Sequence, residues 1–309
     1  MRPQSNTDIL VLGGTGMLGH KMFQRLRKRF PETYCMIRGS IDDPSVRNCD
    51  LLRSGQVFQN WDLTDFNAFE RFFLEHKPRV VVNCVGIIKH RPASTEPVPS
   101  ILTNALLPHQ LSRLCGQSGA RLITFSTDCV FSGKRGNYRE GDPADAQDLY
   151  GRTKSLGELA NDSGNALTLR TSIIGRELVH SESLLEWLLD QNHRRVYGYK
   201  RALFSGVTTH RLADLVGDLI EKHPNLCGLY HVAGQTISKF DLLCLLRETY
   251  ELDIEILPDE EFVCDRSLRG DKLEAATGYL CPPWPELVDQ LGSDQTPYDE
   301  WRTVKNEVL

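Results

Sequence analysis

The stretch LYGRTKSLGE at residues 149–158 places a tyrosine and a lysine four positions apart. Four residues are about one helical turn, so the side chains of Tyr150 and Lys154 would share one face of a helix. A free tyrosine loses its proton near pH 10, and a neighbouring cation lowers that pKa. The pair could therefore donate a proton near neutral pH, but the same spacing is also typical of an ordinary surface helix. The surrounding elements have to decide between these two interpretations.

A glycine-rich turn near the N-terminus carries a second chemical signal. The segment VLGGTGMLGHKMFQRL has the spacing G-x-x-G-x-x-G over residues 13–19, between an apolar strand and an amphipathic helix. Small residues let the backbone approach a pyrophosphate, and the helix N-terminus offers it free N–H groups. This context predicts a dinucleotide site, whereas a turn built only for close packing is the alternative. The residues predicted to contact the dinucleotide here are Gly13, Thr15, Gly16, Met17 and Leu18.

Arg38 ends the second predicted strand, where an NAD-binding unit usually carries an acidic residue. A guanidinium can bind a 2′-phosphate with paired hydrogen bonds, whereas a carboxylate would repel it. The sequence therefore predicts NADP(H) in preference to NAD(H), although Arg38 could simply solvate a strand end. The remaining predicted cofactor contacts flank the adenine or follow later strands, and they are Asp62, Leu63, Cys84, Val85, Gly86, Ser172 and Ile173.

Short apolar, β-branched runs alternate with amphipathic stretches through the first half of the chain. The expected strands are residues 8–14, 33–38, 56–62, 79–86, 120–127 and 166–174. The expected helices are residues 17–30, 65–76, 101–118 and 150–162. This rhythm is typical of a parallel sheet with helices on both faces, so we predict an α/β class, a doubly wound parallel (Rossmann) sheet.

The rhythm of short strands and helices changes after about residue 175. We therefore expect an NAD(P)-binding Rossmann domain over residues 1–174 and a smaller α/β substrate-binding domain over 175–309. A segment near 205–236 could return to the first domain. A cleft between the two domains is the expected ligand site.

Ligands of a doubly wound sheet lie at the carboxyl ends of its strands, which brings Thr127 and the Tyr150 helix together. Thr127 ends the strand expected at 120–127. A hydroxyl, a phenol and a cation beside a nicotinamide would form a carbonyl-reduction site. There the phenol protonates the carbonyl oxygen and the hydroxyl holds it. This chemistry needs no metal, and the sequence has no H-E-x-x-H or clustered Cys/His site.

The composition excludes several other classes of function. Lys and Arg total 36 against 41 for Asp and Glu, a net charge of -5, so neither a nucleic-acid nor an acidic-membrane binder is expected. No apolar stretch approaches the roughly 20 residues that span a bilayer. The nine cysteines are odd in number and have no metal-ligand spacing, which favours a reduced, cytoplasmic compartment.

The segments GGTGMLGH, NCVG, TNALLPHQL, FSTDCVFSG, YGRTKSLGE and LRTSIIG occur in this order over residues 8–175. Together they resemble the extended short-chain dehydrogenase/reductases, above all the branch of dTDP-4-dehydrorhamnose reductase and related sugar-nucleotide reductases. The resemblance implies that Tyr150 is the catalytic acid and Thr127 the carbonyl-binding hydroxyl. It implies that Lys154 lowers the pKa of Tyr150 and binds the nicotinamide ribose, and that Asn104 is a structural support.

The same resemblance implies an NADPH-dependent reductase of a nucleotide-diphosphate 4-keto-6-deoxysugar in surface polysaccharide assembly. An epimerase or dehydratase acting on such a substrate stays open, as does a non-catalytic NADP-binding regulatory subunit like that of methionine adenosyltransferase. Dehydratases typically carry an Asp-Glu pair after the catalytic hydroxyl, whereas Asp128 is followed here by Cys129, which we interpret as packing. A homodimer is left open. The predicted substrate contacts are Lys89, His90, Asp128, Arg201 and Arg266.

Overall fold

The computed structural model describes residues 9–88, 95–159, 164–179 and 181–302. Seven strands form one sheet in the order β11-β6-β5-β4-β1-β2-β3, and all their pairings are parallel. This order runs outward in both directions from β1, as in a doubly wound fold, and confirms the predicted fold class. The strands are β1 (Ile9–Leu12), β2 (Thr33–Met36), β3 (Val57–Phe58), β4 (Val80–Asn83), β5 (Arg121–Thr127), β6 (Ala166–Thr171) and β11 (Gly228–His231).

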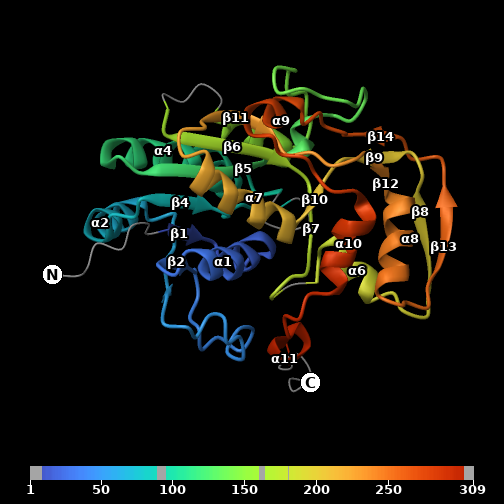
Figure 1. Cartoon of the computed structure of the whole chain (residues 1–309), viewed down its shortest axis with the longest axis horizontal. Helices are drawn as coiled ribbons and strands as arrows, with labels where there is room; N and C mark the ends of the chain where they lie inside the picture. The colour runs from blue at the N-terminus through green and yellow to red at the C-terminus, as the bar shows by residue number, and fades with distance from the viewer. Residues whose placement is uncertain (1–8, 89–94, 160–163, 180, 303–309) are drawn as a thin grey trace.

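Helices cover both faces of the large sheet (Figure 1). The odd-numbered residues of β1 share a core with α1 (Met17–Arg29) and α7 (Thr209–Lys222). Its even-numbered residues share a second core with α2 (Phe66–His76) and α4 (Leu107–Ser118). Because successive side chains of a strand point to opposite faces, β1 is buried on both sides, which explains its continuous apolar run.

Two of the predicted strands differ from the observed ones. The strand expected at 56–62 is reduced to the two residues of β3. The strand expected at 166–174 is divided into β6 and β7 (Ile173–Ile174), and β7 pairs with β10 (Val207–Thr208) outside the large sheet. Ser172 lies between β6 and β7, and its carbonyl accepts a hydrogen bond from the backbone N–H of Val207 at 2.9 Å. The chain therefore leaves the large sheet at this residue.

Two predicted helices also differ. The helix expected at 101–118 starts as α3 (Pro97–Ser100), continues as a π-helix (Ile101–Leu106) and becomes α-helical only at α4. The helix expected at 150–162 is α5 (Leu149–Leu156), and residues 160–163 lie outside the described residues. α5 ends at Gly157, where a Cβ atom would lie 2.0 Å from the carbonyl oxygen of Asn104. Close packing on the π-helix thus decides where α5 stops.

The chain beyond β7 builds smaller sheets and helices, which we call the second lobe. β8 pairs with β13, and β9 lies between β12 and β14. Its strands are β8 (Arg195–Tyr199), β9 (Ala202–Phe204), β12 (Ile237–Ser238), β13 (Glu255–Asp259) and β14 (Cys264–Asp265). Its helices are α6 (Leu184–Leu189), α8 (Lys239–Thr249), α10 (Trp284–Gly292) and α11 (Tyr298–Arg302), whereas α9 (Asp271–Thr277) packs against β11 of the large sheet. β11 is instead a strand of the large sheet, and α7 packs on one face of that sheet. The predicted domain boundary at residue 174 stays a prediction.

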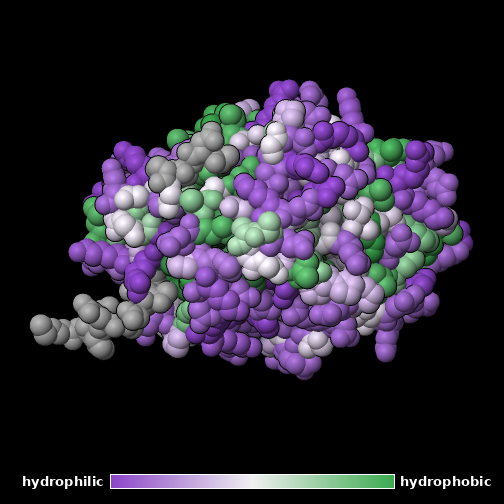
Figure 2. All heavy atoms as spheres, turned by 45° about the horizontal axis from the view of Figure 1, so that its top comes forward, coloured by the Kyte–Doolittle hydropathy of each residue, from purple (hydrophilic) through white to green (hydrophobic). Residues whose placement is uncertain are grey.

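The surface in Figure 2 is mainly hydrophilic with smaller apolar areas. α3, the π-helix and α5 contact one another, and their exposed apolar side chains are Val98, Ile101, Leu102, Leu106 and Leu156. Within the part of the chain that the structure describes, no helix combines the length and the apolar character that a membrane crossing requires.

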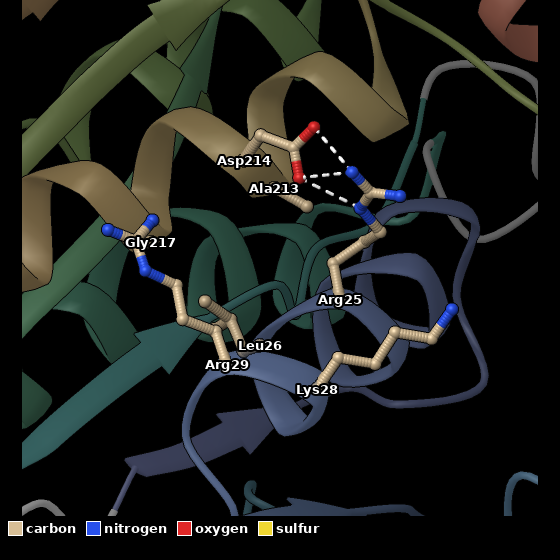
Figure 3. Close-up of a pocket in the computed structure, with 7 residues that line it drawn as sticks. All are labelled: Arg25, Leu26, Lys28, Arg29, Ala213, Asp214 and Gly217. Atoms are coloured by element: carbon tan, nitrogen blue, oxygen red, sulfur yellow. Dashed lines mark hydrogen bonds and ion pairs between the residues drawn. The ribbon is translucent and has the colours of Figure 1, made fainter.

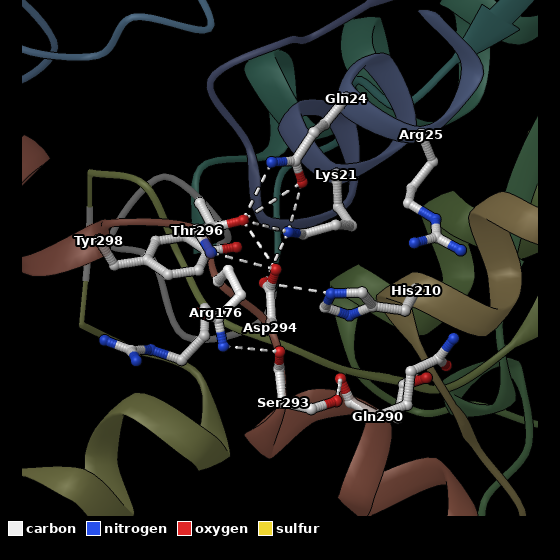
Figure 4. A network of polar contacts seen from close by, with 12 residues as sticks. Lys21, Gln24, Arg25, Arg176, His210, Gln290, Ser293, Asp294, Thr296 and Tyr298 are labelled. Atoms are coloured by element: carbon white, nitrogen blue, oxygen red, sulfur yellow. Dashed lines mark hydrogen bonds and ion pairs between the residues drawn. The ribbon is translucent and has the colours of Figure 1, made fainter. Parts of the chain in front are cut away.

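The segment between α10 and α11 closes over α1 through buried charges (Figure 4). The side chain of Lys21 on α1 is 1% exposed, and its amino group donates a hydrogen bond to Asp294 at 2.7 Å. Thr296 accepts a second one at 3.0 Å. Burial alone would raise the pKa of Asp294, but hydrogen bonds from His210 and Lys21 hold it well below its usual range. The C-terminal segment therefore supplies the counter-charge that the Lys21 ammonium needs in this position.

We expect Asp294→Asn to lower the free energy of unfolding by about 3 kcal/mol, because breaking a buried ion pair leaves one charge uncompensated. Urea denaturation followed by circular dichroism measures this quantity. Asp299→Asn is the matched control, since Asp299 is 98% exposed and lies 3.7 Å from Arg176. Equal stabilities of the two variants would contradict the prediction.

Candidate active site

The turn between β1 and α1 has the geometry that the glycine spacing predicted. Gly13 has a φ of +83°, a conformation that side chains rarely adopt. A Cβ atom on Gly19 would lie 2.0 Å from the carbonyl oxygen of Gly13, so only glycine lets α1 pack this close to the turn. Thr15 and Gly16 lie in the turn, and Met17 and Leu18 begin the helix. No acidic residue occupies the first turn of α1, so its positive end is available to an anion.

Arg38 and Asp62 lie close together at the carboxyl ends of β2 and β3. Both side chains are exposed, and Leu63 beside them is half-buried. Hydrogen bonds from the backbone and hydroxyl of Thr64 lower the pKa of Asp62, and the charge of Arg38 adds to that effect. A cation and a carboxylate therefore share the edge of the sheet at which the sequence places the adenosine.

The loop after β4 reaches the helix that carries the tyrosine and lysine. Cys84 and Val85 are half-buried and Gly86 is exposed. A Cβ atom on Gly86 would lie 3.9 Å from the Nζ atom of Lys154. Ser172 and Ile173 are both half-buried and follow β6, which lies two strands from β4 in the sheet. The predicted cofactor residues that follow five strands, β1, β2, β3, β4 and β6, thus share the carboxyl edge of the sheet.

α5 is held in place by its N-cap residue and by a contact with the end of β5. Asp148 caps the helix, and its carboxylate accepts a hydrogen bond from the backbone N–H of Gly151 at 2.8 Å. Tyr150 and Lys154 are half-buried on this helix. The amino group of Lys154 donates to the carbonyl oxygen of Phe125 on β5 at 2.6 Å. The helix is therefore anchored two residues before Thr127, the last residue of β5.

The structure corrects the expected electrostatics of Tyr150. Burial raises the pKa of Tyr150 far above its ordinary value, the neighbouring Cys129 adds to the rise, and a hydrogen bond with Thr127 acts against it. The amino group of Lys154 donates to the carbonyl oxygen of Phe125 and is not among the groups that act most strongly on this pKa, so the expectation that Lys154 lowers it stays a prediction. Burial lowers the pKa of Lys154 to about 8, while Glu158 acts in the opposite direction.

Asn104 lies in the π-helix and holds the loop after β4. Its side chain accepts a hydrogen bond from the backbone N–H of Ile87 at 2.9 Å and donates one to the Ile87 carbonyl at 3.0 Å. The amide also lies 3.5 Å from the hydroxyl of Thr153 on α5. A π-helical turn commonly occurs near a functional site because it re-aims single side chains. These contacts are those of a residue that supports the site.

A cluster of charges lies beside Thr127, and part of it was missed from the sequence. Asp128 is buried, and burial raises its pKa while the charges of Lys239 and Arg266 oppose the rise. Arg266 donates from Nε to the carbonyl oxygen of Phe131 at 2.9 Å, and its Nη1 lies 3.9 Å from the sulfur of Cys129. The structure therefore brings Asp128 and Arg266 together, as predicted substrate contacts require.

Lys239 is the residue that sequence reasoning did not identify. It begins α8 in the second lobe, and its Nζ atom lies 3.6 Å from the centre of the Phe204 ring. Burial lowers its pKa, and the neighbouring Asp128 opposes this. The only signal in the sequence is a lysine directly after the capping residue Ser238, which gives no indication that it faces Asp128.

The other predicted substrate contacts, Arg201, Lys89 and His90, are not shown to lie at this cluster of charges. Arg201 lies in an exposed turn between β8 and β9, and its role stays a prediction. Lys89 and His90 fall outside the described residues. Among the residues that the structure does describe, no group of three or more His, Cys, Asp or Glu side chains could hold a metal ion.

Two surface pockets lie apart from the residues discussed above. One, of about 270 Å³, lies between α1 and α7 and contains the Arg25–Asp214 ion pair (Figure 3). The other, of about 340 Å³, lies between β3 and α2 and is lined by Phe58, Trp61 and Phe72 among others. Neither pocket is lined by a predicted site residue, so the cleft expected between the two domains stays a prediction.

The arrangement at the carboxyl edge can bind a dinucleotide and move a proton. The glycine turn and the N-terminus of α1 form an anion site, and the end of β5 presents Thr127 beside Tyr150 and Lys154. A phenol with a raised pKa keeps its proton over the physiological range. Lys154, half-buried one helical turn further along α5, is a source of positive charge.

Comparison with known proteins agrees with this geometry. The family model of the RmlD substrate binding domain matches residues 7–266. The chain is 33% identical over 161 residues to dTDP-4-dehydrorhamnose reductase from Streptomyces griseus, a match that spans 52% of this chain and 46% of the relative. It is 27% identical over 264 residues to methionine adenosyltransferase 2 subunit beta from Xenopus tropicalis, spanning 79% of this chain and 72% of that protein.

Solved structures share the fold. The dTDP-4-dehydrorhamnose reductase from Bacillus anthracis in complex with NADP has a TM-score of 0.75 and 19% identity, covering 92% of this chain and 97% of that one. The resemblance stated from the motifs is confirmed by the family model, which extends from the first strand to Arg266. This chain belongs to the RmlD substrate binding domain family.

Proposed function

We propose that this protein is an NADPH-dependent reductase of a nucleotide-diphosphate 4-keto-6-deoxysugar. The observation that carries the proposal is the meeting of Thr127, Tyr150 and Lys154 at the end of β5, on the edge that also carries the glycine turn. The sugar-nucleotide reductase among its relatives supports the substrate class. We assign the product to surface polysaccharide assembly, as the resemblance of the motifs implies.

The residues of this chain divide the reaction between them. Bound NADPH would supply the hydride to the carbonyl carbon. Tyr150 would give its proton to the carbonyl oxygen, and Thr127 would hold that oxygen with its hydroxyl. The Lys154 ammonium would stabilise the negative charge left on the phenol. The raised pKa of Tyr150 keeps the proton in place until the substrate accepts it.

We propose that Lys239 and Arg266 bind the diphosphate end of the substrate. Both cations act on the buried Asp128, and together the three side chains carry a net charge of about +1 when ionised. A net positive charge beside Thr127 favours an anionic substrate such as a nucleotide diphosphate. We therefore assign the diphosphate to these two cations.

A regulatory subunit is the second candidate function. The longer of the two sequence matches above is to a protein named as a subunit of methionine adenosyltransferase. In that case the dinucleotide site would stabilise a binding surface and no turnover would occur.

Incubating the protein with NADPH and a panel of 4-keto sugar nucleotides separates a reductase from a regulatory subunit, because only a reductase consumes NADPH. The consumption is followed at the nicotinamide absorbance. An epimerase would convert the sugar without net NADPH consumption.

Replacing Tyr150 with Phe keeps the ring but removes the phenolic proton. Turnover should fall by a factor of about 100 or more, the usual scale for a positioned acid, while NADPH still binds. Tyr197→Phe is the control, because Tyr197 is exposed on β8 in the second lobe. Parent-like turnover by Tyr150→Phe would exclude the phenol as the proton donor.

Because of Arg38, the parent protein should bind NADPH with a lower dissociation constant than NADH. Arg38→Ala should narrow the difference between NADPH and NADH, since it removes the guanidinium that a 2′-phosphate would contact. Fluorescence titration with each cofactor measures both dissociation constants. Arg113→Ala, at an exposed position on α4, should leave the ratio unchanged. Equal binding of the two cofactors by the parent protein would refute the preference.

The rate of reduction should fall as the pH rises through about 8. Lys154 has a pKa lowered to about 8, so it carries its charge below that pH and loses it above. Tyr150 stays protonated through this range because its own pKa is raised. The measurement is the rate of reduction at saturating substrate across the pH range. The variant Lys154→Met should lose most of its activity, and the remaining activity should no longer decline near pH 8. A parent rate that stays constant up to pH 10 would show that the ammonium is not needed.

A further inference from the structure

Residues 294–302, which we call the strap, lie against the first half of α1 (Figure 4). Thr296 accepts hydrogen bonds from the amino group of Lys21 at 3.0 Å and from the side-chain amide of Gln24 at 2.9 Å. Trp301, near the end of the strap, is buried in the core that α1 shares with α7. The strap therefore packs on the helix that follows the predicted dinucleotide turn.

His20 connects the strap to the glycine turn. It ends the first turn of α1 and is fully buried. Its Nε2 atom lies 2.8 Å from the hydroxyl oxygen of Tyr298 in the strap, and its Nδ1 atom lies 2.8 Å from the carbonyl oxygen of Gly16. The buried ring of Tyr298 meets the imidazole edge-on, with the ring centres 5.6 Å apart. A residue 278 positions away from His20 is thus one side chain removed from the turn.

The acceptor at Gly16 decides the direction of both hydrogen bonds. A carbonyl oxygen can only accept, so Nδ1 of His20 carries the hydrogen and donates to it. Burial lowers the pKa of His20 to about 3, so the ring is neutral and its Nε2 atom is an acceptor. The hydroxyl of Tyr298 then donates to Nε2, and it keeps its proton because burial raises the pKa of Tyr298. The three groups therefore allow one arrangement of their hydrogens.

Gly16 is the residue that these hydrogen bonds hold. It is the N-cap of α1, and its backbone N–H donates to the carbonyl oxygen of Gly13 at 3.0 Å. Its carbonyl oxygen accepts the helical N–H of His20 at 3.1 Å and the ring Nδ1–H as a second donor. The free N–H groups that open the helix follow directly, and these are the donors that a pyrophosphate would contact. Fixing Gly16 therefore fixes the direction of those donors.

We propose that Tyr298 is a positioning residue for the dinucleotide turn and acts through His20. Its hydroxyl selects the tautomer of His20 whose Nδ1–H holds the carbonyl of Gly16. In the other tautomer, a lone pair on Nδ1 would face that carbonyl oxygen and repel it. The turn would then be competent to bind for only a fraction of the time, which weakens the apparent affinity by that fraction.

Nothing in the family match assigns this task to Tyr298, which lies beyond the matched residues 7–266. The glycine spacing gives no sign of it either, because it ends at Gly19. The dinucleotide is the one part of the proposed function that this inference requires, and the reduction itself is not needed.

The test compares two variants of the full-length protein that each lose one hydroxyl of the strap. Tyr298→Phe removes the donor to His20 and keeps the ring, whereas Thr296→Val removes contacts with other side chains of α1 and leaves the path to Gly16 intact. Fluorescence titration measures the dissociation constant for NADPH. Tyr298→Phe should raise it roughly twofold to tenfold, the factor that corresponds to one net hydrogen bond. Thr296→Val should leave it unchanged, and urea denaturation of both variants compares their stabilities.

NMR of ¹⁵N-labelled histidine gives a readout that a merely structural role would not change. The two ring signals missing from His20→Asn assign His20. In the parent protein they should show a protonated Nδ1 and an unprotonated Nε2. In Tyr298→Phe the two shifts should move toward each other, because both tautomers become populated, whereas Thr296→Val should keep the parent shifts. A His20 tautomer that is the same in Tyr298→Phe as in the parent would overturn the proposal.

A double variant guards against a loss of stability, because Tyr298→Phe leaves Nε2 of His20 buried without a donor. Tyr298→Phe combined with His20→Leu removes both polar groups and also the bond to Gly16, and it should raise the NADPH dissociation constant as well. Parent-like constants in both folded proteins would overturn the proposal and leave the dinucleotide site in place.

Binding and turnover separate this inference from the proposed function. A parent protein that binds NADPH but reduces none of the 4-keto sugar nucleotides, with weaker binding by Tyr298→Phe, would refute the reductase and support the role of Tyr298. A parent protein that binds neither NADPH nor NADH would refute both.

Discussion

The parallel pairing of the seven-stranded sheet is the constraint on which the rest of the molecule depends. Because every pairing is parallel, all carboxyl ends lie at one edge. The chain needs this edge to bring the glycine turn after β1, the loop after β4 and the end of β5 together. The helices between the strands cover both faces of the sheet.

The second constraint is the pairing of charges that are buried between the two parts of the molecule. Glu186 of α6 accepts hydrogen bonds from Arg176 and from both terminal nitrogens of Arg302 on α11. Lys21 and Asp294 join α1 to the C-terminal segment in the same way. An unpaired ion in such a place costs several kcal/mol. These pairs therefore favour one arrangement of the second lobe against the large sheet.

The candidate site uses burial to set the ionisation of its groups. Removal from water raises the pKa of Tyr150 and lowers that of Lys154, so both neutral forms gain stability. The hydrogen bond between Tyr150 and Thr127 opposes the first effect, and the charge of Glu158 opposes the second. A site of this kind holds its proton in the resting protein. The approach of a substrate carbonyl would change that balance.

The sequence by itself determined the order of the elements and the doubly wound fold, because local periodicity and glycine spacing are written along the chain. The family followed from the resemblance of its motifs. It also placed Tyr150 and Lys154 on one helix next to the end of β5. Their roles, like those of the predicted cofactor and substrate residues, stay predictions.

Only the tertiary structure decided where the chain leaves the sheet at Ser172, where α5 ends, and which distant side chains meet. Lys21 and Asp294 are 273 residues apart, and the charge of Asp128 acts on the pKa of Lys239 from the other part of the molecule. The direction of the Tyr150 pKa was wrong from sequence for the same reason. Desolvation and ion pairing depend on how completely other segments exclude water from a group, and that is a property of the folded packing and not of residue spacing.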